Sequence, residues 1–100
     1  MERRIITTPI FRRKVENICG YIGREFGNKA VLVFITKLDS RLNLILKYPD
    51  SGRPLSDRTN VKSFLFTPHN KIYYKIYPSR ITVLDLIDMR EHSVKNPFIK

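Results

Sequence analysis

The sequence predicts a single α+β domain in which one strand precedes two helices and three further strands follow them. Three observations predict this order. A short run of β-branched residues opens the chain, two long segments carry apolar residues every three or four positions, and three short apolar runs lie between turn residues near the end. We therefore expect a β-α-α-β-β-β domain spanning residues 1–100, with an antiparallel sheet and a helical hairpin packed on one face.

The first strand and the first helix are expected within residues 3–27. Residues 3–7 (RRIIT) have the β-branched composition of a short strand. Thr8 and Pro9 predict a helix start, because Thr is a good N-cap and Pro fits the first helical position. Gly27 is expected to end this helix. Its apolar stripe comprises Phe11, Val15, Ile18, Ile22 and Phe26.

A second helix is expected from Asn28, a suitable N-cap, to Lys47. Its apolar positions follow the same spacing and are Ala30, Val31, Phe34, Leu38, Leu42, Ile45 and Leu46. Because only a residue or two separates the two helices, they should form an antiparallel hairpin. Residues 48–60 (YPDSGRPLSDRTN) contain two prolines and a glycine, so they are expected to be a loop without a periodic segment.

Three strands are expected at residues 61–67, 71–77 and 80–88, joined by turns at 68–70 and 78–79. They should form an antiparallel meander. In the middle one, alternation predicts Ile72, Tyr74 and Ile76 on the core face and Lys75 outward. Residues 80–88 are apolar at both parities, which predicts a central position in the sheet.

The net charge of +10, from 19 Lys and Arg against 9 Asp and Glu, is large for 100 residues. It predicts a polyanionic partner, which is nucleic acid, an acidic protein or an anionic membrane face. The charge belongs to the folded body rather than to a tail, because ten basic residues lie in positions 1–50 and nine in 51–100. Solubility alone is the other explanation.

Several features favour a cytoplasmic protein. No apolar run approaches the roughly 20 residues of a membrane span, and the first residues, MERRIITTPI, do not resemble a signal peptide. The single cysteine, Cys19, cannot form an internal disulfide, which suits a reducing compartment. Cys19 lies near the first apolar stripe and is expected to be a small core residue.

The residue types favour phosphate chemistry. The sequence has no Gly-rich phosphate loop, no CxxC, no HExxH and no cluster of metal ligands. Cleavage of RNA by its own 2′-hydroxyl needs a base, one or two cations and an acid. Arg90, Glu91 and His92 are consecutive just past the last expected strand and supply these types. Arg80 and Lys62 open two of the strands, and the meander should bring Lys71 near the end of the last one.

Each of these residues also has a structural interpretation. The structural interpretation of Arg90 is an ion pair with Asp88 or Glu91. The structural interpretation of His92 is an exposed residue that follows a strand. Lys62 is also explained as an outward lysine that protects a sheet edge.

Other positions also carry expectations. Lys71, Tyr73 and Lys75 are candidates for RNA binding, because exposed tyrosines stack on bases. Tyr73 and Tyr77 are as readily explained by packing on the tail, and His69 by a place in a turn. Asp85, inside an apolar strand, is expected to pair with a Lys or Arg, since a buried unpaired carboxylate is costly.

Motifs spread over nearly the whole chain resemble the RelE/ParE superfamily of type II toxins. In order they are a helix ending in YIGREFG, a helix running into YPDSGRP, and the segments VKSF, KIYYKIY and VLDLIDMREH. Gly52-Arg53 matches the family's "fP..Gr" element together with Tyr48-Pro49, and Lys62 stands where the family often has Arg. Arg90 matches the Arg that ends the last strand.

The resemblance implies a small basic toxin that a neighbouring antitoxin wraps and neutralises. RelE-like members cleave mRNA in the ribosomal A site without a metal, so no cofactor is expected, whereas ParE-like members poison DNA gyrase. A YoeB-like branch ends in Arg-x-His-Tyr. Here Arg90-Glu91-His92 keeps Arg-x-His, but Ser93 replaces the Tyr.

The first functional expectation is a ribosome-dependent mRNA endoribonuclease. Arg90 and Lys62 would act on the scissile phosphate, Arg80 on phosphate or rRNA, His92 as general acid and Glu91 as base. The second is a non-enzymatic toxin that binds gyrase through its basic face and helical hairpin. The third is a relative that only binds an antitoxin. None of the three implies a membrane partner.

Overall fold

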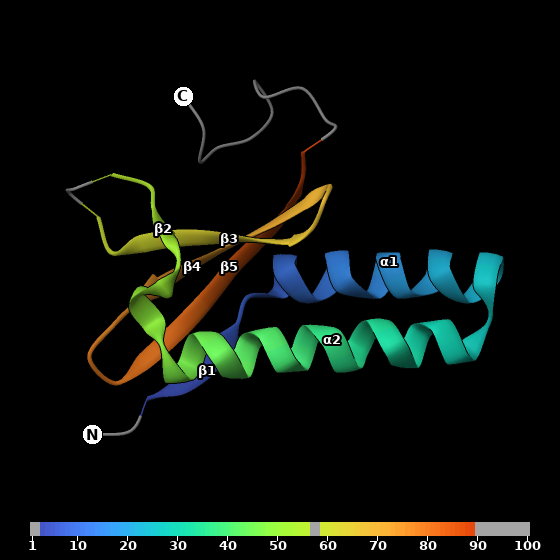
Figure 1. Cartoon of the computed structure of the whole chain (residues 1–100), viewed down its shortest axis with the longest axis horizontal. Helices are drawn as coiled ribbons and strands as arrows, with labels where there is room; N and C mark the ends of the chain where they lie inside the picture. The colour runs from blue at the N-terminus through green and yellow to red at the C-terminus, as the bar shows by residue number, and fades with distance from the viewer. Residues whose placement is uncertain (1–2, 57–58, 90–100) are drawn as a thin grey trace.

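Two helices pack on one face of a five-stranded mixed sheet (Figure 1). The computed structural model describes residues 3–56 and 59–89. The helices are α1 (Pro9–Phe26) and α2 (Asn28–Lys47), with a short 3-10 helix η1 (Pro49–Ser51) after them. The strands are β1 (Arg4–Thr7), β2 (Arg53–Pro54), β3 (Val61–Thr67), β4 (Asn70–Ile76) and β5 (Arg80–Asp88). The expected α+β class and element order are confirmed.

The sheet has the strand order β1-β5-β4-β3-β2. The β3-β4-β5 meander is antiparallel, and β5 lies centrally, as predicted. The expectation of a wholly antiparallel sheet is wrong, because β1 pairs with β5 in parallel, with Ile5 opposite Ile81. Parallel neighbours need a long connection, and here both helices and the meander lie between the two strands.

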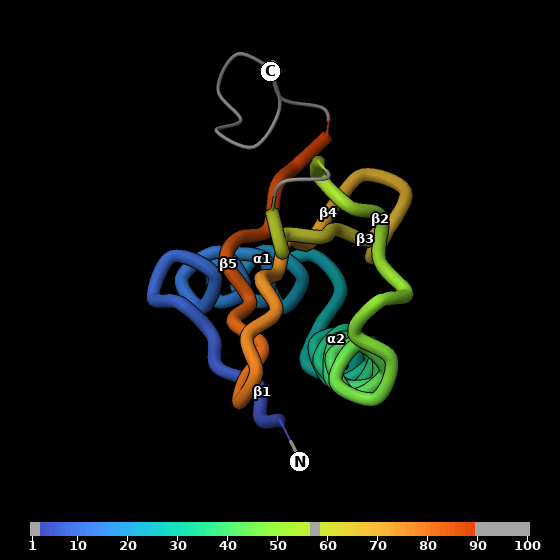
Figure 2. Tube along the Cα trace, turned by 90° about the vertical axis from the view of Figure 1, so that its left-hand side faces the viewer, coloured from blue at the N-terminus to red at the C-terminus, as the bar shows by residue number. Residues whose placement is uncertain are grey.

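Residues 48–56 contain regular structure where the sequence predicted a loop. They include η1 and the two-residue strand β2, which pairs with β3 through Arg53 opposite Ser63. Pro49 begins the 3-10 turn, and the pairing is too short to leave any periodicity in the sequence. Figure 2, which looks along α2, shows that β2 and β3 lie on the side of the sheet above this helix.

The two helix starts differ. The Thr8 hydroxyl accepts from the Phe11 N–H at 3.1 Å and donates to the Leu84 carbonyl at 2.7 Å, so the predicted N-cap also ties α1 to β5. Gly27 ends α1 with φ of 92°, the region that favours glycine, as predicted. The expectation for Asn28 is wrong, since the N-cap of α2 is Gly27 and no side chain caps it.

The core lies between the helices and the sheet. Its buried residues are Phe11, Leu38, Phe66, Ile72, Val83 and Leu86, joined by a second cluster of Ile45, Tyr74 and Ile81. The alternation expected in β4 is confirmed, because its pairing with β3 is unbroken from Lys71 to Lys75 and places Ile72 and Tyr74 on the core face. Tyr73, on the opposite face, is buried as well, which the sequence did not predict. Cys19 is only partly buried, and burial together with Glu16 raises the pKa of its thiol.

Neither α1 nor α2 is long and apolar enough to cross a bilayer, within the part of the chain described.

Candidate functional site: a cationic groove beside β3

A groove of about 430 Å³ lies where α2, the η1–β2 segment and the sheet meet. Its walls come from segments far apart in the chain, and Met89, the residue after β5, also lines it. Three lining residues are cations, and no acidic side chain is among the described ones. The lining residues are Arg41, Ser51, Gly52, Arg53, Ser63, Phe64, Leu65, Lys71 and Met89.

Arg41 reaches into the groove from α2. One guanidinium nitrogen donates to the Leu65 carbonyl at 3.1 Å, and the guanidinium carbon lies 5.0 Å from the centre of the Phe64 ring. Its Nε is buried and has no hydrogen-bond partner in the described chain. Because a guanidinium carries five N–H donors, Arg41 retains donor capacity for an anion in the groove.

Arg53 is positioned by two hydrogen bonds between the η1 segment and a buried tyrosine, which we call the clamp. The Tyr74 hydroxyl donates to the Pro49 carbonyl at 2.7 Å and accepts from the Gly52 N–H at 3.1 Å. A Cβ on Gly52 would lie 2.3 Å from that hydroxyl, so only glycine fits there. The clamp therefore fixes both ends of η1 and directs the chain into β2 at Arg53.

Tyr74 suits this role because its side chain is fully buried. Burial raises the pKa of its phenol and Asp50 adds to this, while the Gly52 N–H acts in the opposite direction. The phenol therefore stays protonated beyond the usual tyrosine range and keeps donating to Pro49.

Lys71 completes the cationic lining. It lies opposite Leu65 in β3 and opposite Ile87 in β5, so the predicted proximity of Lys71 to the end of the last strand is confirmed. The Met89 N–H donates to the His69 carbonyl at 2.6 Å, which holds the end of β5 beside the β3–β4 turn.

The predicted catalytic segment directly follows Met89 in the sequence. Arg90, Glu91 and His92 themselves lie outside the described residues, so their roles stay predictions. His69 serves the turn, where its N–H donates to the Thr67 hydroxyl at 3.1 Å.

Arg80 and Lys75 are not brought to the groove. Arg80 opens the nine-residue strand that Asp88 closes, so the two ends are roughly 26 Å apart at strand geometry. Both cations lie over the ring of Tyr77, Arg80 at 3.9 Å and Lys75 at 5.3 Å from its centre. We call this set of three the distal cluster.

Two other candidates lie near the groove without lining it. Lys62 precedes the lining residue Ser63 in β3, opposite Pro54 and Tyr74. Tyr73 is only 2% exposed, so its ring is not free to stack on a base in this structure. Asp85 pairs with Lys14 at 2.8 Å, as predicted.

Sequence reasoning missed Arg41 and named Arg53 only within a motif. A signal for Arg41 was present, since it continues the apolar spacing of Phe34, Leu38 and Ile45 on α2. A cation inside an apolar stripe indicates a side chain with a tertiary role.

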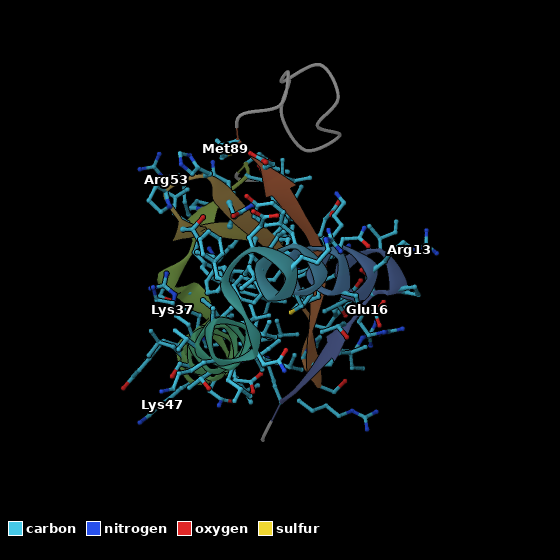
Figure 3. The ribbon with its side chains drawn as sticks, turned by 90° about the vertical axis from the view of Figure 1, so that its right-hand side faces the viewer. Arg13, Glu16, Lys37, Lys47, Arg53 and Met89 are labelled. Atoms are coloured by element: carbon cyan, nitrogen blue, oxygen red, sulfur yellow. The ribbon has the colours of Figure 1, made fainter. Side chains whose placement is uncertain are left out.

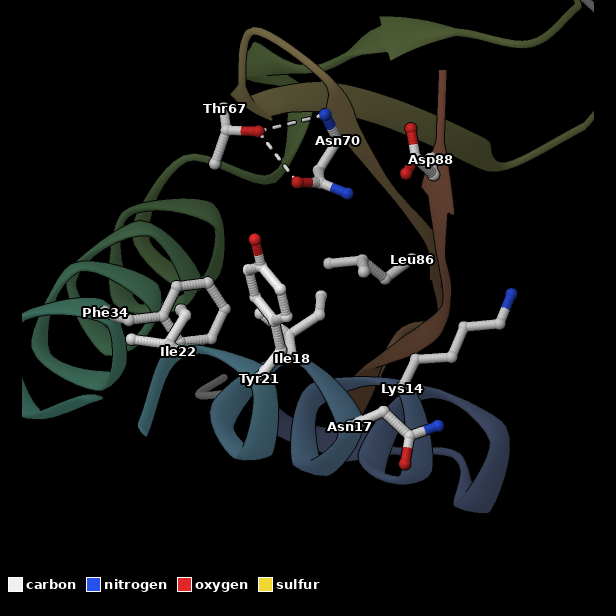
Figure 4. A pocket seen from close by; sticks show the side chains of 10 residues that line it. All are labelled: Lys14, Asn17, Ile18, Tyr21, Ile22, Phe34, Thr67, Asn70, Leu86 and Asp88. Atoms are coloured by element: carbon white, nitrogen blue, oxygen red, sulfur yellow. Dashed lines mark hydrogen bonds between the residues drawn. The ribbon is translucent and has the colours of Figure 1, made fainter. Parts of the chain in front are cut away.

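A second cleft, of about 480 Å³, lies between α1 and the ends of β4 and β5 (Figure 4). Ile18, Ile22, Phe34 and Leu86 form its apolar part, and Lys14 and Asp88 give it charges of both signs. Its mixed charge makes it a weaker anion site than the groove. Among the described residues, no three His, Cys, Asp or Glu side chains gather closely enough to hold a metal.

Comparison with known proteins agrees with this architecture. No protein-family model matches the sequence, and no curated protein matches it. A chain of the chromosomal ParDE TA system from P. aeruginosa is similar at a TM-score of 0.71 and 13% identity, covering 90% of this chain and 98% of that one. The YoeB/ParE toxin from Agrobacterium tumefaciens is similar at a TM-score of 0.62 and 17% identity, covering 88% and 98%. The fold expected from the RelE/ParE resemblance is therefore the fold of this chain.

Proposed function

We propose that this protein is the toxin of a type II toxin–antitoxin system and acts as a ribosome-dependent mRNA endoribonuclease. The fold shared with a ParDE chain and a YoeB/ParE toxin supports the toxin class. The observation that carries the activity is the cationic groove, whose wall ends at Met89 immediately before Arg90-Glu91-His92 in the sequence. An antitoxin, the ribosome and mRNA are the partners that this function requires.

The proposed reaction is an attack of the 2′-hydroxyl on the adjacent phosphate. Glu91 takes the 2′-hydroxyl proton, and His92 donates a proton to the departing 5′-oxygen. The products are a 2′,3′-cyclic phosphate and a free 5′-hydroxyl. No oxidation or additional reactant is involved.

The cations stabilise the charge that develops on the phosphoryl oxygens. We assign this stabilisation to Arg53, Arg41 and Lys71, which line the groove, and to Arg90, which follows Met89 in the sequence. Two other roles follow from position. Lys62 contacts the RNA backbone beside the groove, whereas Arg80, at the opposite end of β5, contacts rRNA rather than the bound mRNA.

Two parallel assays on the purified protein test this proposal. Primer extension on translating ribosomes should reveal cuts in the mRNA, while supercoiling by DNA gyrase should proceed normally. His92→Ala should abolish cleavage and leave thermal unfolding unchanged. Intact mRNA together with blocked supercoiling would overturn the endoribonuclease and favour the gyrase toxin.

A gyrase-directed toxin is the second candidate function. Two observations favour it, namely the higher TM-score with the ParDE chain and Ser93 in the position where a YoeB-like ending has Tyr. In that case the groove binds an acidic protein surface, and the Glu91 and His92 side chains have no chemical task.

A further inference from the structure

Two exposed apolar side chains lie in the cationic groove, and the proposed reaction gives them no task. Leu65 is 55% exposed and Met89 is 40% exposed, and both line the groove together with Lys71. A single exposed apolar side chain is ordinary on a protein surface. Two of them in a cavity that also gathers three cations indicate a ligand with an apolar part beside an anionic part.

The strand register places these side chains around Lys71. Lys71 in β4 lies directly opposite Leu65 in β3 and Ile87 in β5, and such partners have Cβ atoms about 5 Å apart on one face of a sheet. The neighbouring Ile72 belongs to the core, so this row lies on the other face. Met89 follows Ile87 by two residues, and alternation returns it to the same face. Because β4 lies between β3 and β5, Lys71 lies between the two apolar side chains.

The aromatic rings near the groove are already engaged or buried. Phe64, the one aromatic side chain among the described lining residues, has the Arg41 guanidinium 5.0 Å from its ring centre. Tyr73 is 2% exposed. A flat ring that enters the groove therefore meets the aliphatic surface of Leu65 and the thioether of Met89. A methionine sulfur makes favourable contacts with aromatic rings and adapts its shape to them.

A nucleotide combines the two chemical parts that this lining fits. Its base has apolar faces, and its phosphate takes the charge of Arg53 and Lys71. In Figure 3, Arg53 and Met89 lie at the same end of the molecule, both at the top of the view. Contact with apolar side chains senses the area of a ring rather than its exocyclic groups. It therefore favours two-ring purines over pyrimidines and treats adenine and guanine alike.

We propose that Leu65 and Met89 form a base platform, which holds a purine base next to the phosphate bound by the groove cations. This inference rests on the proposed function, because the groove must bind RNA for a base to reach these side chains. The platform positions the RNA and gives the groove a preference among bases. It takes no part in proton transfer.

Three short oligonucleotides test the base platform on the full chain. All are tetranucleotides with 2′-O-methyl groups, which block cleavage, and they carry adenine, uracil or no base on the same phosphates. Fluorescence anisotropy at low salt measures their affinities. We expect the adenine probe to bind about fivefold more tightly than the uracil probe and at least about tenfold more tightly than the abasic one.

The variant Leu65→Ser/Met89→Ser removes the platform and keeps all three groove cations. It should bind the adenine probe about tenfold more weakly than the parent does, and the abasic probe within about twofold of the parent. Both side chains are well exposed, so the fold should persist, which circular dichroism checks. The matched control is Ile10→Ser on α1, because Ile10 is 55% exposed like Leu65 and lies outside the groove. It should bind all three probes as the parent does.

The possible outcomes separate the platform from the proposed function. Equal affinity for the adenine and abasic probes would overturn the platform and leave the endoribonuclease standing. A preference for adenine that survives in the double variant would also overturn the platform, since the base would then bind elsewhere. If the parent binds none of the three probes, the platform and the RNA-directed function fail together.

Discussion

The cationic groove and the distal cluster are both basic, but they are built differently. In the groove, cations from α2, β2 and β4 converge from positions 41, 53 and 71. In the distal cluster, Lys75, Tyr77 and Arg80 lie within one hairpin, and the tyrosine ring already engages both cations. Positive charge alone therefore does not locate a site in this chain. What distinguishes the groove is that its cations converge from three separate elements on one cavity.

The largest expected effect separates these two surfaces by activity. Arg53→Ala removes a groove cation and should slow mRNA cleavage on ribosomes about 100-fold, whereas Arg80→Ala should change the rate less than about threefold. Single-turnover cleavage rates measure both. Equal losses would show that the two surfaces act together and that the comparison is mistaken.

The next largest effect is expected from a substitution in the clamp that positions Arg53. Gly52→Ala places a Cβ against the Tyr74 hydroxyl and should lower the free energy of unfolding by about 2–3 kcal/mol. Gly20→Ala is the matched control, because its Cβ meets nothing closer than 3.4 Å inside α1. It should raise stability by about 0.5–1 kcal/mol. Urea unfolding of both variants measures whether the two changes in the free energy of unfolding have opposite signs. An unchanged free energy for Gly52→Ala would contradict the role assigned to the clamp.

A milder test removes only the hydroxyl. Tyr74→Phe should cost about 1–2 kcal/mol in urea unfolding, because the Pro49 carbonyl and the Gly52 N–H lose their shared partner. The control Tyr21→Phe changes a hydroxyl on a side chain that is 55% exposed and should be nearly neutral.

The same phenol sets a pH dependence. Its folded pKa is raised above the ordinary value of 10.0, so its stabilising contribution is complete below about pH 10 and is lost as the pH rises through the folded pKa. The parent should therefore lose more stability above pH 10 than Tyr74→Phe does. Urea midpoints of both proteins from pH 8 to 11 measure the difference, and parallel curves would contradict the shift.

The smallest expected effect is the contribution of the distal cluster to the stability of the fold. Arg80→Ala should lower the free energy of unfolding by about 0.5–1 kcal/mol through loss of the stacking on Tyr77. Lys75→Ala, whose ammonium lies farther from the ring, should cost less. Thermal unfolding of the two variants measures which loss of stability is larger. A larger loss for Lys75→Ala would contradict the stacking assigned to Arg80.

Much of the fold was predictable from sequence because its signals are local. The apolar spacing of α1 and α2, the Thr8 cap, the Gly27 end and the meander turns act over a few residues each. The parallel pairing of β1 with β5 was not predictable, since no local sequence signal indicates that Ile5 pairs with Ile81. The burial of Tyr73, which lies on the other face of β4 from Tyr74, likewise has no local signal in the sequence.

The candidate site was less predictable for the same reason. Lys71 was found because hairpin register follows from the turns. Arg41 depends on how α2 packs against β3, and Arg53 depends on a tyrosine hydroxyl that arrives from β4. Arg80 was placed with them because spacing along one strand does not show which end faces a cleft.

The central claim is that RNA binds at the groove rather than at the other basic surfaces. A titration with a short single-stranded RNA bearing 2′-O-methyl groups, which block the attack, tests it by backbone amide shifts in NMR. The account predicts the largest shifts at Arg53, Leu65 and Lys71, with Tyr77, Arg80 and the exposed α2 residues Leu32 and Val33 near their free values. Shifts concentrated at the distal cluster or on the exposed side of α2 would contradict it.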